Sequence, residues 1–216
     1  MNKVSAALGG LVFTTALSLN SGAVAEIVDF EDIDLQGEVS LPAPYVIGDH
    51  ADYFYFANFG CFDSILADEA LGYSGYTNGA TSGNQAAYSV FAAPSSIVLS
   101  NYSAGDRFDL AGGFFTSAWR EGLQVRIRAF IGFDNEEIYD QTFTVNSDAS
   151  YLDLGITGAS MVTFETYGGT FAGFSNDGSN FIMDDIDLTV VPAPSVITTV
   201  VLAGLLRRRR REMEGT

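Results

Sequence analysis

Residues 123–131 read Leu-Gln-Val-Arg-Ile-Arg-Ala-Phe-Ile, and this stretch decides the fold class. Apolar side chains occupy every second position from Leu123 to Ile131, and Arg126 and Arg128 stand between them. Successive side chains of a strand point to opposite faces, so a period of two predicts a half-buried strand. We therefore expect Arg126 and Arg128 on a polar sheet face.

Similar segments recur along the chain, with turn residues between them. Asn78-Gly79 and Asn176-Asp177-Gly178 are typical of turns. No stretch of the body keeps a helical period for about 12 positions, and only Glu69–Leu71 is expected to form a helical turn. Many short strands joined by polar turns predict an all-β fold, an antiparallel sandwich of two sheets. The other expected strands are 26–33, 52–57, 87–91, 96–99, 107–110, 114–118, 137–145, 161–167 and 181–190.

The charge of the chain is distributed unevenly. Its 216 residues include 27 Asp and Glu against 10 Lys and Arg, a net charge of −17. Lys3, Arg207–Arg211 and two of the acids lie near the ends, so residues 26–191 carry 25 acids against 4 Arg, or −21. Nucleic-acid affinity comes mainly from counterions displaced by Lys and Arg, so nucleic acid is excluded as a partner. Anionic lipid surfaces are disfavoured too, which leaves cations and neutral glycans.

Catalytic side chains are scarce. The single Cys cannot form an internal disulfide or a thiolate zinc site. Cys61, between aromatic residues, is expected to be a small buried hydrophobe. His50 lies in a polar loop, and no motif places a nucleophile within its reach. With 25 scattered acids some carboxylate pair is unavoidable, so such a pair does not predict a glycosidase. We predict that the protein is not an enzyme.

The first 25 residues have the layout of a secretory signal peptide. Lys3 precedes an apolar stretch, Ala6–Leu19, and the segment ends in Ala23-Val24-Ala25. The apolar core is too short for a normal membrane span, and the small residues predict cleavage after Ala25. The alternative, a first helix of the domain, would have to be buried on all sides. We expect an exported protein.

The C-terminal segment has a second targeting layout. Val191-Pro192-Ala193-Pro194 is followed by an uncharged run to Leu206 and then by five Arg, Arg207, Arg208, Arg209, Arg210 and Arg211. Counted from Val190, the apolar run would form a helix of about 25 Å, at the lower limit for crossing a bilayer. The Arg cluster would keep its end in the cytoplasm. A eukaryotic lipid-anchor signal lacks such a cluster.

These elements resemble the PEP-CTERM sorting signal of Gram-negative bacteria, in its VPAP variant rather than its Pro-Glu-Pro form. The resemblance implies processing around Pro192–Pro194 by exosortase, a membrane protease-transpeptidase, while the apolar helix and Arg207–Arg211 hold the chain in the membrane. It implies passage through the inner membrane, then display on the cell surface or in the extracellular matrix. A plain tail anchor is the alternative. The expected organisation is a signal peptide over 1–25, a β-sandwich over 26–190 and a sorting signal over 191–216, comprising a motif at 191–195, a transmembrane helix at 196–206 and the Arg cluster at 207–211.

A second resemblance covers residues 108–189. The segments FDLAGGFFTSAWREGLQVRIRAF, IYDQTFTVN, MVTFETYGG and NFIMDDIDLT occur in that order. They resemble a domain often found on PEP-CTERM proteins. The resemblance implies the jelly-roll sandwich of galactose-binding and carbohydrate-binding modules. It implies little about the ligand, because one sandwich hosts many functions.

Structural calcium is the one cofactor that the sequence suggests. Calcium prefers carboxylate and carbonyl oxygens, and the expected first and last strands carry Glu31, Asp184 and Asp185. In modules of the carbohydrate-binding type these strands often lie side by side, and several hold calcium there. Asp184 is expected to share the inward face of its strand with Ile186 and Leu188, where a carboxylate needs a partner. Calcium, loop amides and an Arg are the alternatives.

A sugar site is the other candidate. Sugar rings stack on aromatic side chains, and polar groups hold their hydroxyls. Tyr73 and Tyr76 lie in a Gly-rich stretch, Trp119 stands at the end of a strand, and Arg126 and Arg128 lie on the expected polar face. For Trp119 the alternative is core packing, and for the two Arg it is pairing with acids.

Two function classes follow. The first is a surface-displayed, non-catalytic module that binds extracellular polysaccharide. The second is a structural or adhesive acidic protein whose stability or self-association depends on calcium and which has no specific glycan ligand.

Overall fold

The computed structural model describes residues 23–41, 45–46, 54–99, 105–132 and 135–193. All of them belong to one compact unit, Gly22–Pro194. His50, most of the expected signal peptide, and the tail from Pro194 onward with its apolar run and Arg cluster lie outside the described residues. Within the described ranges, no helix has the length and apolarity needed to cross a membrane.

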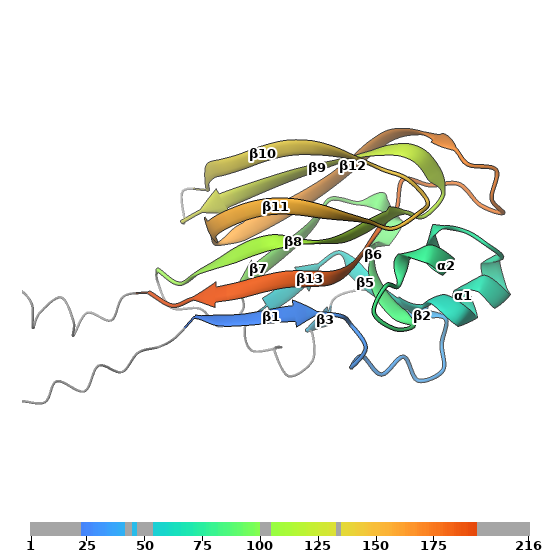
Figure 1. Cartoon of the computed structure of the whole chain (residues 1–216), viewed down its shortest axis with the longest axis horizontal. Coiled ribbons are helices and arrows are strands. Elements are labelled where there is room, and N and C mark those ends of the chain that lie inside the picture. Colours follow the sequence, from blue (N-terminus) through green and yellow to red (C-terminus); the bar gives the residue numbers. More distant parts are fainter. Residues whose placement is uncertain (1–22, 42–44, 47–53, 100–104, 133–134, 194–216) are drawn as a thin grey trace, which may run out of the picture. The chain divides into compact units, whose positions relative to one another are not determined.

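The described strands form two antiparallel sheets, which confirms the expected β-sandwich (Figure 1). The seven-stranded sheet has the order β11 (Ser150–Ala159), β8 (Arg107–Ser117), β13 (Phe181–Val191), β6 (Gln85–Ser89), β5 (Phe59–Asp63) and β2 (Ser40–Leu41), and β1 (Val24–Val28) also pairs with β13. The six-stranded sheet has the order β10 (Glu136–Val145), β9 (Arg120–Ile131), β12 (Met161–Phe171), β7 (Ser95–Leu99), β4 (Phe54–Ala57) and β3 (Tyr45–Val46).

Aromatic side chains fill the space between the sheets. The ring of Phe59 packs edge-on against Phe56, Phe164 and Phe181, with centroid distances of 6.0, 5.7 and 5.7 Å. The inward residues of β9, from Leu123 to Ala129, are fully buried in the same core. The alternation that predicted this strand therefore has its physical cause in one face packed on the opposite sheet.

The ends of the domain lie side by side. Strand β1 pairs with the C-terminal half of β13, with Val24 opposite Val190 and Ala25 opposite Thr189. The strand thus includes the last two residues of the expected signal peptide. Strand β13 ends at Val191, where the first Pro of the VPAP motif follows, because Pro cannot donate a ladder hydrogen bond.

A β-bulge in β13 changes the expected face of Asp184. The pairing with β8 shifts between Asp184 and Asp187, and Asp185 has a φ of 50°. Met183 and Ile186 both point into the core between the sheets, whereas Ile182 packs in a separate cluster on the outer face. Asp184 therefore lies on the outer face with Ile182, and the expectation that it shares the face of Ile186 was wrong.

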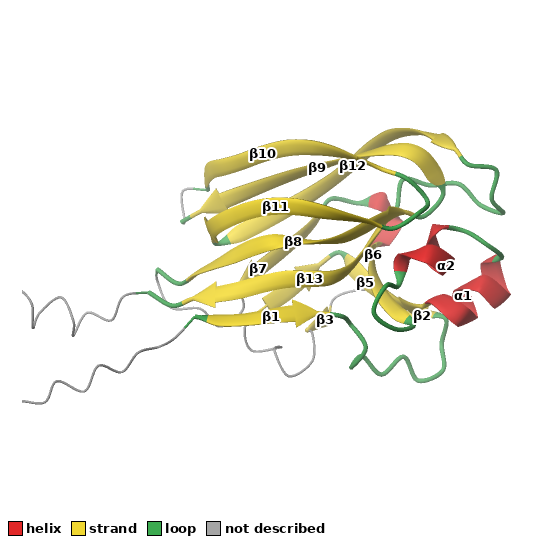
Figure 2. Cartoon of the chain, viewed as in Figure 1, coloured by secondary structure: helices red, strands yellow, loops and turns green. Residues whose placement is uncertain are grey.

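Two short helices cover part of the outer face of the seven-stranded sheet (Figure 2). They are α1 (Ser64–Leu71), which contains the expected helical turn, and α2 (Gly75–Gly79). Beneath them lies a second apolar cluster, formed by Phe62, Ala67, Tyr76, Ala86, Ala118, Trp119 and Ile182. The helices lie at the end of the domain opposite the start of β1 and the end of β13 (Figure 1).

Candidate functional site

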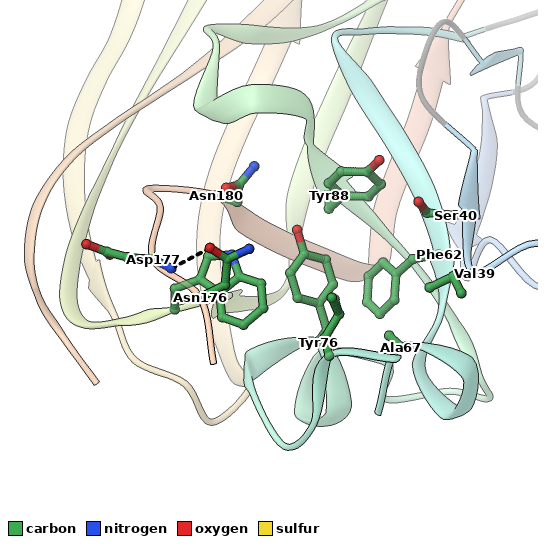
Figure 3. A pocket seen from close by; sticks show the side chains of 11 residues that line it. Val39, Ser40, Phe62, Ala67, Tyr76, Tyr88, Asn176, Asp177 and Asn180 are labelled. Atoms are coloured by element: carbon green, nitrogen blue, oxygen red, sulfur yellow. Dashed lines mark hydrogen bonds between the residues drawn. The ribbon is translucent and has the colours of Figure 1, made fainter. Parts of the chain in front are cut away.

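A pocket of about 250 Å³ opens beside the two helices, over the outer face of the seven-stranded sheet (Figure 3). One side of it is aromatic and another is polar. Helix α1, helix α2, strand β6 and the connection from β12 to β13 all contribute side chains. The lining residues are Val39, Ser40, Phe62, Ala67, Leu71, Tyr76, Tyr88, Trp119, Asn176, Asp177 and Asn180.

Helix caps and one glycine position the helical side of the pocket. The Asp63 side chain caps α1 by accepting from the amides of Ile65 and Leu66, both at 2.9 Å. Ser74 and Thr77 form a capping box at the start of α2. The Gly75 amide donates to the Ala118 carbonyl at 3.0 Å, so α2 rests directly on the end of β8 and holds Tyr76 against Trp119.

The aromatic side consists of rings in mutual contact. The centroid of Tyr76 lies 5.3 Å from that of Trp119, 4.8 Å from that of Phe62 and 5.8 Å from that of Tyr88. The contacts with Phe62 and Tyr88 are edge-on and that with Trp119 is tilted, and together they fix the position of the Tyr76 ring. Burial raises the pKa of Tyr76 above its ordinary value, with a smaller contribution from Tyr88. Its hydroxyl therefore stays protonated and remains a hydrogen-bond donor.

The polar side is a loop that an ion pair fastens to the sheet. Arg120 donates from Nε and Nη2 to the two carboxylate oxygens of Asp177, at 2.8 and 3.0 Å, and from Nη1 to the Gly168 carbonyl at 3.0 Å. Asn180 donates from Nδ2 to the Ser89 carbonyl at 2.6 Å. A two-bond guanidinium–carboxylate pair restricts orientation as well as distance. The loop therefore holds Asn176, Asp177 and Asn180 in place at the pocket.

The ion pair between Arg120 and Asp177 predicts how the pocket responds to acid. The hydrogen bond from Arg120 lowers the pKa of Asp177 below its ordinary 3.8. A lowered carboxyl pKa means that the pair persists above the ordinary value and is lost only as pH falls through the lower folded-state value. We expect the fluorescence of Trp119, the single Trp of the chain, to change as pH falls below 3.8, where Asp177 becomes protonated. Fluorescence that stays constant below pH 3.8 would contradict this assignment.

The structure brings together two of the five residues expected to bind sugar. Tyr76 and Trp119 both line the pocket. Tyr73 is 60% exposed and does not line it; its hydroxyl accepts from Asn78 Nδ2 at 2.8 Å, and its ring packs on Phe174. Tyr73 therefore contacts Asn78 and Phe174, and it lies outside the pocket lining.

Arg126 and Arg128 lie on the six-stranded sheet, away from the pocket. Arg126 forms two hydrogen bonds with Asp140, at 2.8 and 2.6 Å. Arg128 contacts Glu165 at 2.9 Å and Glu137 at 3.7 Å. Both guanidinium groups thus neutralise acids on neighbouring strands, which is the alternative to sugar binding that the sequence left open for them.

Tyr88, Asn180 and Phe62 complete the pocket, and the sequence did not point to them. Tyr88 alternates with the inward Ala87 in β6, which places it on the helix-covered face. The sequence there reads Ala-Ala-Tyr, without a polar and apolar alternation, and nothing local indicates that helices cover this face. The site therefore depends on long-range packing.

The residues expected to bind calcium meet one loop, residues 81–85, through hydrogen bonds. Asp184 Oδ2 accepts from the amides of Thr81 and Ser82 at 2.6 and 3.1 Å and from both hydroxyls. Asp185 Oδ2 accepts from Thr81 Oγ1 at 3.0 Å, and Glu31 accepts from the Gln85 amide at 2.6 Å. The structure thus shows the loop-amide alternative at Asp184.

These donors do not suit a cation. Asp184 is fully buried; burial raises the pKa of its carboxyl, and the amides of Thr81 and Ser82 oppose that rise. N–H groups that point at a carboxylate occupy the lone pairs that a metal would need. Within the described ranges, no group of three or more His, Cys, Asp or Glu side chains could hold a metal ion. This also applies to a second hollow, of about 370 Å³, that Glu31 helps to line.

Removing calcium with a chelator tests the calcium site that the sequence suggested. Because the oxygens of Asp184 already have protein donors, we expect the melting midpoint to be the same with a chelator as with added calcium. Scanning calorimetry under both conditions measures it. A midpoint that falls by several degrees in chelator would restore the calcium site.

Cys61 is a packing residue, as expected. Its side chain is fully buried in the core between the sheets. Burial raises the pKa of its thiol to about 12. The nucleophilic thiolate is therefore absent at neutral pH.

Comparison with known proteins shows which solved structures share this fold. No family model and no curated protein matches the chain. A DUF4465 family protein from Bacteroides caccae is similar in structure, with a TM-score of 0.53, 13% identity, and 78% of this chain and 99% of that chain covered. For a DUF4465 family protein from Bacteroides ovatus the values are 0.51, 9%, 77% and 99%. TmCBM61, solved with beta-1,4-galactotriose, aligns more weakly, at a TM-score of 0.32, 10% identity, and 62% and 86% coverage. At these identities the chain shares its β-sandwich fold with the two DUF4465 proteins.

Proposed function

We propose that the protein is an exported, non-catalytic binding module with the jelly-roll sandwich of carbohydrate-binding modules, and that its pocket takes a neutral sugar unit of an extracellular polysaccharide. The observation that carries the proposal is the pairing of aromatic rings, Tyr76, Tyr88 and Trp119, with the amides Asn176 and Asn180 around one pocket. Aromatic rings contact the apolar faces of sugars, and amides can both donate to and accept from hydroxyls.

The size of the pocket favours one sugar unit. Pockets for drug-sized ligands occupy roughly 300–1,000 Å³, and this one occupies about 250 Å³. A single ring fits such a space, whereas a buried chain of several rings does not. The rest of a polysaccharide would then lie outside it.

Charge favours a neutral ligand. Asp177 is the one charged residue in the described lining, and Arg120 already pairs with it. Residues 26–191 carry a net charge of −21, so the surrounding field repels anionic glycans. Uronic-acid or sulfated polymers are therefore poor ligands for this site.

Binding is tested with neutral and acidic glycans on an array, followed by calorimetry with the best ligand. We expect saturable binding to a neutral glycan, weakened about fivefold by Asn176→Ala, since a lost ligand hydrogen bond costs about 1 kcal/mol. Asn176 is exposed, so the variant should fold. Tyr73→Ala, an aromatic change outside the pocket lining, is the matched control and should bind normally. A blank array with folded protein rejects the proposal, and calcium-dependent self-association without glycan binding favours the structural alternative.

We also propose that exosortase processes the tail at the cell membrane. The support is the position of the VPAP motif: β13 ends at Val191, and the Ala193 amide donates to Asp106 Oδ1 at 2.8 Å. The motif therefore begins where the sandwich ends, at the end of the domain opposite α1 and α2 (Figure 1).

Processing is tested in a cell that carries an exosortase and in a matched strain without it. Full-length chain should accumulate in the membrane of the strain without exosortase, and a shorter form should appear at the surface of the other. Replacing Arg207–Arg211 by Ser should reduce membrane retention, because the positive cluster fixes the orientation of the helix. Identical chain lengths in both strains would reject processing and favour the alternative, a plain tail anchor.

A further inference from the structure

Phe91 is the most exposed large apolar side chain of the described residues. It lies in the short turn η2 (Val90–Ala92), which directly follows β6, and it is 91% exposed. An isolated exposed apolar residue is ordinary. Here, however, the backbone conformation and the position of the turn are both unusual.

The turn holds Phe91 in a costly backbone conformation. Phe91 and the next residue, Ala92, have φ values of 55° and 53°, in the left-handed region that bulky residues rarely adopt. Asn58 directly precedes β5, has a φ of 59° and clamps the turn through two hydrogen bonds. Its carbonyl accepts from the Val90 amide at 2.9 Å, and its Nδ2 donates to the Pro94 carbonyl at 2.8 Å. Strained conformations that surrounding contacts enforce are concentrated at functional sites.

The turn adjoins the pocket. Tyr88, three residues before Phe91, lines it, and three residues span at most about 11 Å. Asn180, another lining residue, donates to the carbonyl of Ser89, the residue directly before η2. Figure 3 shows Tyr88 and Asn180 together on the side of the pocket away from the helices. A glycan that leaves the pocket on this side passes the turn.

We propose that Phe91 is a second subsite, which stacks on the sugar unit next to the one in the pocket. The inference rests on the proposed function and makes it more specific: the ligand is an oligosaccharide of at least two neutral units rather than a monosaccharide. The clamp supports this use, because a ring held ahead of binding loses little conformational entropy when the ligand arrives.

Calorimetry with a mono-, di- and trisaccharide of the glycan identified on the array tests the subsite. We expect the wild type to bind the disaccharide about tenfold more tightly than the monosaccharide, near the upper end for one aromatic contact. Phe91→Ala should abolish this gain and leave monosaccharide binding unchanged. Tyr167→Ala, which removes a 50% exposed ring on the other sheet, is the matched control and should keep the gain.

The outcomes separate the two proposals. Monosaccharide binding with an unaltered length dependence in Phe91→Ala overturns the subsite and leaves the pocket intact. Absence of binding at every length rejects the pocket and the subsite together. Sedimentation that shows a wild-type dimer and a monomeric Phe91→Ala variant assigns Phe91 to self-association and also overturns the subsite. Because Ala is no more strained than Phe at this φ, the variant should fold, and circular dichroism verifies it.

Discussion

Asp184→Asn is expected to lower the free energy of unfolding by about 3 kcal/mol, because buried donors that lose their acceptor cost about 1–3 kcal/mol each. In the wild type, Oδ2 accepts from the Thr81 and Ser82 amides and Oδ1 accepts from the Asp185 amide at 2.9 Å. The Asn side chain has one acceptor oxygen, so its NH₂ group must face donors that it cannot satisfy. Urea denaturation followed by circular dichroism measures the loss.

Asp187→Asn in the same strand is the control. It makes the same chemical change at a half-buried position, for which no side-chain hydrogen bond is seen in the described structure. We expect a change within about 0.5 kcal/mol there, as is usual for surface positions. Equal losses in the two variants would show that loop 81–85 does not depend on Asp184.

The sequence predicted strands best where one face is buried and the other is polar. Strand β9 alternates because its inner face packs between the sheets and its outer face carries Arg126 and Arg128. Strand β5 was missed because Phe59, Cys61 and Phe62 are all buried, so no alternation remains. Helices cover its outer face, and that coverage is a long-range property.

Glycine and a bulge account for two other differences. Strand β11 was not expected, since Gly155 and Gly158 make its sequence look like a loop; both have positive φ at shifts in the pairing with β8. The bulge at Asp185 reverses the alternation within β13, and no local sequence signal gives its position. The expected face of Asp184 was therefore wrong although the strand itself was right.

The candidate site was predicted in part for the same reason. Trp119 and Tyr76 drew attention as aromatic residues near glycines and a strand end. Their contact depends on α2 resting on the end of β8, and Tyr88 from β6 and Asn180 from the connection before β13 reach the same pocket. Residue type can suggest a ligand class, whereas the set of lining residues follows from topology.

The close approach of α2 to β8 gives the second prediction with a large effect. A Cβ atom added at Gly75 would lie 1.8 Å from the Ser117 carbonyl oxygen and 2.9 Å from the Ala118 Cα. These are backbone atoms, so a side-chain rotation cannot relieve the overlap. Gly75→Ala must therefore displace α2, and with it the ring of Tyr76, from the end of β8. We expect a loss of stability of about 3 kcal/mol or more, the range in which overpacking becomes disruptive, together with loss of glycan binding.

Gly72→Ala is the matched control for this change. A Cβ atom there meets no atom within 4 Å, although its φ of 73° makes Ala unfavourable. The expected cost is about 1–2 kcal/mol, that of an L-residue in the left-handed region, and glycan binding should persist because α2 stays in place. Urea denaturation and calorimetry with the same glycan distinguish the two variants. If Gly75→Ala binds as well as Gly72→Ala does, the pocket does not depend on the docking of α2, and the assignment of Tyr76 to the site fails.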